Sequence, residues 1–156
     1  GNAPIDMLFC VPPDGVERDG NGVRSSMSTV LSEWGTETWD GVDPHARLDF
    51  PRSSNQARIV QYASCRGLEG WTVVLDRFDR FLEHIASWKR SSEAGGTEGF
   101  VDLETASDRE AWRWGMIALT RPIDTLVIQL QDAESKYARQ VLDIASTMED
   151  FAEIVR

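Results

Sequence analysis

The sequence has few of the residues that build metal centres, disulfide frameworks or membrane spans. Its two cysteines and two histidines lie far apart, and none has the spacing of a metal site. A secreted domain stapled by disulfides would carry more cysteines, so we expect reduced thiols in a cytoplasmic protein. No apolar run approaches the roughly 20 residues that a membrane helix needs, and no secretory apolar segment opens the sequence. We therefore expect neither a bound metal nor a membrane partner.

Positive charge is also scarce. Lys and Arg together number 16 against 26 Asp and Glu, which gives a formal net charge of −10 with His neutral. A protein that binds nucleic acid unaided usually has a basic face or stripe. The charge balance therefore argues against strong independent binding to phosphate backbones, though not against a local site.

Motifs of self-contained active sites are missing as well. Without a GxxxxGK[ST] segment, the sequence lacks the glycine cradle, lysine and hydroxyl that hold nucleotide phosphates and Mg²⁺. The GxSxG nucleophile elbow, the HExxH zinc motif and the GxGxxG dinucleotide motif do not occur either. No complete active site is expected in this chain.

The segments that are present alternate between strand and helix patterns. Short apolar or β-branched runs predict strands at residues 5–11, 36–39, 57–63, 72–75 and 123–130. Apolar stripes and capping residues predict helices at residues 25–34, 76–90, 107–119 (opened by a Ser107–Glu110 capping box) and, as one helix or two, 137–155. Loops are expected at residues 14–22 and 40–56, with a flexible linker at about 91–99. The alternation predicts one α/β domain over residues 1–156, with a mostly parallel sheet and helices on both faces.

Tryptophan is frequent for a chain of this length. Trp34 and Trp88 lie on apolar helix stripes, so we expect them to pack in the core rather than serve as base-stacking platforms. Trp112 and Trp114 are two residues apart and cannot share a helix face, so one of them is expected to face solvent or another domain.

Two short segments carry the residues best suited to chemistry. Residues 64–69 (SCRGLE) lie between two predicted strands, and residues 118–121 (ALTR) join a predicted helix to the last strand. Ligands of parallel α/β sheets bind where loops leave the carboxyl ends of strands, and we expect the first segment to lie in such a loop. There, Gly67 would let backbone N–H groups approach an anion, Glu69 suits a ribose hydroxyl, and the planar guanidinium of Arg121 suits a phosphate.

These segments resemble two motifs of superfamily I helicases of the UvrD/PcrA type. SCRGLEGWTVVL (residues 64–75) is similar to their motif V, roughly HSxKGLE before an apolar strand. REAWRWGMIALTRPIDTLVI (residues 109–128) is similar to motif VI, in which Thr-Arg precedes an apolar strand. The predicted strand and helix over residues 5–35 lie where the motif IV elements belong. The resemblance covers nearly the whole chain as the C-terminal RecA-like domain, which has no phosphate loop of its own.

The resemblance implies a role for each segment. In this family ATP and Mg²⁺ bind between two RecA-like domains, and the N-terminal domain of the same polypeptide brings the phosphate loop. Arg121 would then be the catalytic arginine finger, with Gly67 and Glu69 as further nucleotide contacts. Ser64 and Arg66 would contact single-stranded DNA. ATP and Mg²⁺ are thus expected in the full-length protein, and no cofactor is expected in this chain alone.

Three positions depart from the family pattern. Ala63 stands where motif V has histidine, Arg66 replaces its lysine with the charge kept, and Pro122 replaces the alanine after Thr-Arg. Residues 36–56 also leave no room for the large insertion of the best-known members. The changes at Ala63 and Pro122 and the net charge support an alternative, a RecA-like module that binds only protein. A small-molecule enzyme of doubly wound type ranks last, because no nucleophile or acid–base pair stands out.

Plainer interpretations apply to several of these residues. Arg121 could pair with a surface carboxylate, and Glu69 could be solvated without a ligand. Arg66 could be an ordinary surface charge, and Cys65 a small side chain that fills space in the core.

Overall fold

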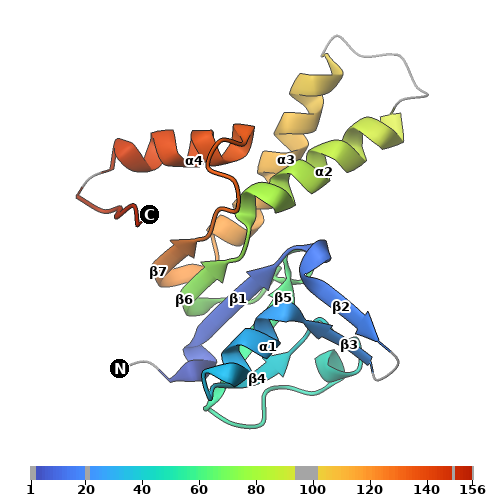
Figure 1. Cartoon of the computed structure of the whole chain (residues 1–156), viewed down its shortest axis with the longest axis vertical. Helices are drawn as coiled ribbons and strands as arrows, with labels where there is room; N and C mark the ends of the chain where they lie inside the picture. The colour runs from blue at the N-terminus through green and yellow to red at the C-terminus, as the bar shows by residue number, and fades with distance from the viewer. Residues whose placement is uncertain (1–2, 20–21, 94–101, 149, 156) are drawn as a thin grey trace.

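A five-stranded parallel sheet forms the centre of the molecule (Figure 1). The computed structural model describes residues 3–19, 22–93, 102–148 and 150–155. The strand order is β4-β5-β1-β6-β7, and each neighbouring pair is parallel. These strands are β1 (Met7–Val11), β4 (Glu37–Asp40), β5 (Gln56–Gln61), β6 (Gly70–Leu75) and β7 (Pro122–Ile128). The predicted parallel sheet is confirmed, with each strand within a few residues of its expected place.

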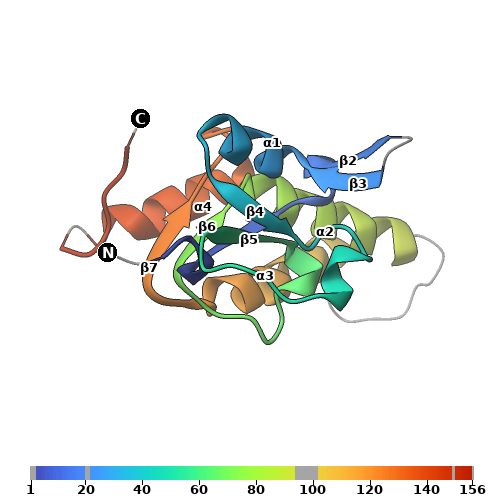
Figure 2. The same cartoon turned by 90° about the horizontal axis from the view of Figure 1, so that it is seen from below.

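Helices cover both faces of this sheet (Figure 2). The α-helices are α1 (Ser26–Glu33), α2 (Phe78–Glu93), α3 (Leu103–Leu119) and α4 (Lys136–Ser146). Short 3₁₀ turns are η1 (Pro4–Asp6), η2 (Pro13–Gly15), η3 (Ala46–Leu48) and η4 (Tyr62–Ser64). Helix α1 lies on one side of the sheet, and α2 and α3 lie on the other. Across the described ranges, no helix combines the length and apolar character needed to cross a membrane.

The central strand β1 shows why an uninterrupted apolar run belongs here. Leu8 and Cys10 point into the core beneath α2 and α3, while Phe9 and Val11 point into a second core beneath α1. A strand between two helical layers must be apolar on both of its faces. The continuous apolar sequence MLFCV is therefore typical of the central strand of such a sheet.

Close packing of α2 and α3 requires a glycine. A Cβ at Gly115 would lie 2.9 Å from a methyl carbon of Leu82 and 3.1 Å from Phe78, both fully buried. The same core holds Tyr62, whose ring stacks on Phe81 with centroids 4.0 Å apart and whose hydroxyl donates to the Asp76 carbonyl at 2.9 Å. This packing anchors the start of the loop that follows β5.

A buried carboxylate fastens the C-terminal part of the fold to α2. Asp79 accepts hydrogen bonds from the backbone N–H groups of Gln131 and Asp132 at 2.9 and 3.1 Å. It also accepts from the hydroxyl of Ser135, the N-cap residue of α4, at 3.4 Å. Since Asp79 is fully buried, these donors replace the water that the carboxylate would otherwise need.

Several boundaries differ from the sequence expectation. The expected loop at residues 14–22 contains most of an antiparallel hairpin, β2 (Val16–Asp19) and β3 (Gly22–Ser25). The expected start of α3 at Ser107 is wrong. Asp102 caps the helix by accepting from the N–H groups of Glu104 and Thr105. Ser107 is instead buried within the helix and donates to the Leu103 carbonyl at 2.6 Å.

The C-terminal and linker expectations also change. Helix α4 ends at Ser146, and residues 147, 148 and 150–155 do not form a second helix. Most of the expected linker at 91–99 lies outside the described residues, and residues 91–93 belong to α2.

The expectation that Trp34 and Trp88 pack in the core is wrong. They are 77% and 56% exposed, respectively. Trp34 follows the short helix α1, in which Leu31 is the buried member of the apolar stripe. Trp88 lies in the half of α2 that runs with α3 beyond the sheet (Figure 1). Trp112 and Trp114 are both half-buried, so the expectation that one of them faces away from the core is not met.

Candidate functional site

The loop between β5 and β6 runs from the side of the sheet where the strands end to the side where they begin. Both strands flank β1 and run parallel to it, so residues 62–69 must lead from the carboxyl end of β5 to the amino end of β6. Tyr62 and Cys65 are buried against the core, whereas Arg66 and Gly67 are exposed. The expected place at the carboxyl ends of strands thus holds for the start of this loop. For Glu69, which directly precedes β6, it is wrong.

The two segments singled out in the sequence meet at the amino ends of β6 and β7. Gly70, directly after Glu69, donates its N–H to the carbonyl of Arg121 at 3.2 Å, and it pairs in register with Pro122. A Cβ at Gly70 would lie 2.9 Å from the Cβ of Leu8 and 3.0 Å from a backbone oxygen, so only glycine fits. The structure therefore brings residues 67–69 and 120–121 together at the amino ends of β6 and β7.

Arg121 is held by the end of its own helix. Its Nε donates to the Ile117 carbonyl at 2.8 Å, and its Nη2 donates to the Thr120 hydroxyl at 3.0 Å. A guanidinium is favoured there because the last carbonyls of a helix carry partial negative charge. Over the described ranges, no carboxylate lies within ion-pair distance of Arg121. The simpler interpretation, a surface ion pair, does not describe this residue.

Gly67 forms an open turn in the loop. Its φ of +81° lies in the left-handed region that favours glycine, and Leu68 closes the turn by donating to the Cys65 carbonyl at 3.0 Å. A Cβ at Gly67 would meet nothing within 4 Å. The backbone is therefore open to a ligand on this side.

Glu69 is positioned through its backbone and leaves its side chain in solvent. Arg58 on β5 donates from Nη2 to the Glu69 carbonyl at 2.7 Å and from Nε to the Ile5 carbonyl at 2.7 Å. The exposed carboxylate of Glu69 forms no ion pair with any residue that the structure describes. Sequence reasoning missed Arg58, because an arginine inside a strand pattern gives no sign of a loop contact.

Ser64 and Arg66 have basic and aromatic neighbours from distant elements. Arg47, in η3, donates from Nη1 to the Ser64 hydroxyl at 2.9 Å. The guanidinium carbon of Arg66 lies 6.0 Å from the ring centroid of Trp114, whose indole N–H donates to Glu110 at 3.0 Å. Two arginines thus flank one exposed turn of an otherwise acidic protein. Arg47 was missed because it lies in a segment expected only to be loop.

Electrostatics link the two segments. The pKa of Cys65 is lowered, first by a hydrogen bond from Cys10 and further by the positive charges of Arg121 and Arg66, against the opposing effect of burial. Arg121 of one segment therefore contributes to the lowered pKa of a thiol in the other segment.

Most of the candidate site residues, among them Arg66, Gly67 and Glu69, lie exposed on the surface. The best-formed hollows in the described part measure about 310 and 270 Å³ and lie elsewhere, beside Asp14 and His84 and beside Trp39 and Phe50. Within the same ranges, no three His, Cys, Asp or Glu residues gather to hold a metal ion. A nucleotide bound here would need a second domain to enclose it, and that domain would have to supply the ligands of its Mg²⁺.

Comparison with family models, curated proteins and solved structures found no match to this chain. The residues and their geometry are the basis for the function proposed next.

Proposed function

We propose that this chain is the second RecA-like motor domain of a superfamily I DNA helicase or translocase. In this proposal ATP is held mainly by another RecA-like domain of the same polypeptide. The observation that supports it best is the hydrogen bond from Gly70, which directly follows the Gly67–Glu69 segment, to the carbonyl of Arg121. The guanidinium of Arg121 pairs with no carboxylate in the described part. A glycine turn and an unpaired arginine are the groups that this domain would add to a nucleotide held mainly by the other domain.

Each group has a definite task in ATP hydrolysis. When water attacks the γ-phosphoryl group, negative charge spreads over its oxygens, and the guanidinium of Arg121 donates hydrogen bonds to them. The open backbone at Gly67 lies against the phosphates, and the Glu69 carboxylate accepts a hydrogen bond from a ribose hydroxyl. The other domain supplies the phosphate loop and the ligands of Mg²⁺.

The same loop couples hydrolysis to movement on DNA. Ser64 and Arg66 contact the phosphate backbone of single-stranded DNA, while Gly67 and Glu69, one to five residues further on, contact the nucleotide. Cys65, between Ser64 and Arg66, is buried and holds this part of the loop against the core. A change at the γ-phosphate therefore alters the grip on DNA.

The pure 156-residue chain is expected to hydrolyse no ATP, because its sequence contains no phosphate loop. A longer parent chain that carries the other domain is expected to hydrolyse ATP faster when single-stranded DNA is added. Phosphate release by both proteins, with and without an oligonucleotide, measures this. Turnover by the 156-residue chain alone, or a parent whose turnover ignores DNA, would contradict the proposal.

A protein-binding module without catalysis is the second candidate. The net charge of −10 and the exposed apolar side chains of the edge strand β7, among them Ile123 at 61%, favour it. A GxxxxGK[ST] segment in the same polypeptide would favour the motor, and its absence there would favour the module.

A further inference from the structure

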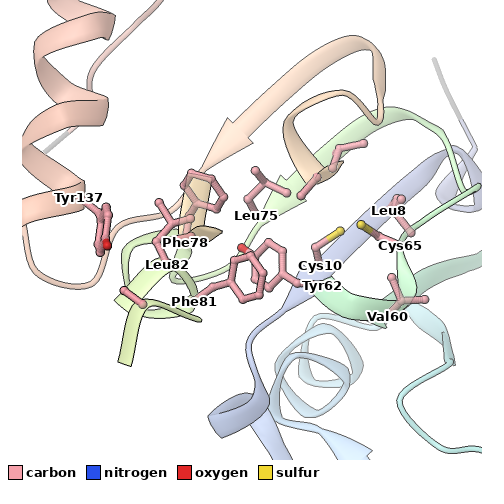
Figure 3. Close-up of a cluster of buried hydrophobic side chains, with 14 residues drawn as sticks. Leu8, Cys10, Val60, Tyr62, Cys65, Leu75, Phe78, Phe81, Leu82 and Tyr137 are labelled. Carbon is pink, nitrogen blue, oxygen red and sulfur yellow. The ribbon is translucent and has the colours of Figure 1, made fainter. Parts of the chain in front are cut away.

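The two cysteines of the chain lie side by side in the core. Cys10 belongs to the central strand β1, and Cys65 belongs to the loop that carries Gly67 and Glu69. Both side chains are fully buried and reduced, and their sulfur atoms point toward one another (Figure 3). The two thiols are close enough to shift each other's pKa. This contact joins two parts of the chain that are distant in sequence.

We propose that Cys10 and Cys65 form an intramolecular disulfide when the protein meets a peroxide. The bond would fasten the 64–69 loop to the central strand. It would form whether or not the loop binds a nucleotide.

The surroundings assign different roles to the two sulfurs. The hydrogen bond to Cys65 and burial raise the pKa of Cys10 well above its ordinary value. The pKa of Cys65 is lowered by the same hydrogen bond and by Arg121 and Arg66. Cys65 lies in a loop with exposed neighbours, whereas Cys10 lies in the central strand of the sheet, so peroxide reaches Cys65 first. Cys65 is therefore the nucleophile and Cys10 the resolving thiol, in agreement with the directions of their pKa shifts.

The reaction balances with hydrogen peroxide as the oxidant. The Cys65 thiolate attacks one peroxide oxygen, the O–O bond breaks, and the hydroxide that leaves is protonated to water. This step gives a sulfenic acid at Cys65. Cys10 then loses its proton and its sulfur attacks that of Cys65, which breaks the S–O bond and releases a second water. Two thiols are oxidised to one disulfide, and the peroxide is reduced to two waters.

Access to Cys65 requires only a local opening of the loop. Its neighbours Ala63, Arg66 and Gly67 are exposed, while Cys10 sits in the middle strand of the sheet. Local opening of a surface loop costs less free energy than global unfolding. We therefore expect oxidation to be slow and its rate to level off at high peroxide, where opening becomes limiting.

The test is intact mass spectrometry of the full chain after peroxide treatment. Remaining thiols are alkylated under denaturing conditions, with and without prior reduction. The expected product is a monomer that is about 2 Da lighter, takes up no alkylating agent, and recovers two reactive thiols on reduction. Two alkylated thiols after long exposure, a Cys65 sulfinic acid without a disulfide, or only disulfide-linked dimers would overturn the proposal.

Two single-cysteine variants test the assigned roles. In Cys10→Ala, a sulfenic acid at Cys65 should accumulate and be trapped by a dione reagent. In Cys65→Ala, Cys10 should stay unmodified under the same conditions, and equal reactivity of the two variants would contradict the assignment. Should either variant fail to fold, the urea midpoint of oxidised wild type provides a second readout. It should exceed that of the reduced protein, because the cross-link constrains the unfolded chain.

Discussion

Replacing Arg121 with alanine in the parent chain should lower kcat for ATP by about 10³-fold or more, the range found for arginine fingers. If Arg121 is the arginine finger, its guanidinium interacts most strongly with the charge that develops on the γ-phosphoryl oxygens, so KM for ATP should change much less. Steady-state phosphate release at saturating single-stranded DNA measures both constants. An unchanged kcat would remove Arg121 from the mechanism.

Two variants control for loss of charge and for damage to α3. Arg113 lies on the same helix, is largely exposed and pairs with Glu110, so Arg113→Ala should leave kcat nearly unchanged. Arg121→Lys keeps the charge but loses the planar fork, and we expect a kcat between those of wild type and Arg121→Ala. Thermal unfolding of each protein establishes that the domain remains folded.

Asp79→Ala should lower the free energy of unfolding by about 3 kcal/mol or more. The substitution leaves two backbone N–H groups and one hydroxyl without their acceptor in a buried place, and each unsatisfied donor costs roughly 1–3 kcal/mol. The N-terminus of α4 would lose its tie to α2. Urea denaturation followed by circular dichroism measures the change, with the m-value expected to stay constant.

Asp124 is the matched control for this prediction. Its carboxylate is exposed and, among the described residues, accepts only from the neighbouring Thr125 hydroxyl, so Asp124→Ala should change stability by less than about 0.5 kcal/mol. Asp79→Asn keeps one oxygen acceptor and should fall between the two alanine variants. A loss below about 1 kcal/mol in Asp79→Ala would show that water replaces the carboxylate.

The strands of the parallel sheet could be predicted because burial on two faces demands a continuous apolar run. MLFCV and TVVL satisfy that demand, and both lie where they were expected. The hairpin β2–β3 could not be found in this way, since VERD and GVRS are polar and lack alternation. Its strands pair outside the main sheet, where no second helical layer imposes a pattern.

The start of α3 shows where local rules compete. Ser107 and Glu110 have the spacing of a capping box, yet Asp102 is the residue that caps the helix. The longer helix prevails because Ser107 can donate to the carbonyl one turn earlier while its side chain is buried. Likewise, the apolar spacing that includes Trp34 and Trp88 predicts which residues share a helix face. It does not predict whether the sheet lies beneath that part of the helix.

Part of the candidate site could be predicted from the sequence, and part could not. Gly67 and Arg121 could be singled out because few residue types suit an open left-handed turn or a phosphate. The contacts of Arg47 with Ser64 and of Arg58 with Glu69 depend on how the β5–β6 connection crosses the sheet. That crossing follows from the strand order, which places β1 between β5 and β6.

Hydrogen exchange in the parent chain, with and without a non-hydrolysable ATP analogue and Mg²⁺, tests the shared nucleotide site most directly. If Gly67, Glu69 and Arg121 form part of this site, amides in residues 66–70 and 117–121 will exchange more slowly with nucleotide bound, while those of α1 will not change. If saturating nucleotide protects other parts of the parent and leaves both segments at their nucleotide-free rates, this edge of the sheet does not bind ATP.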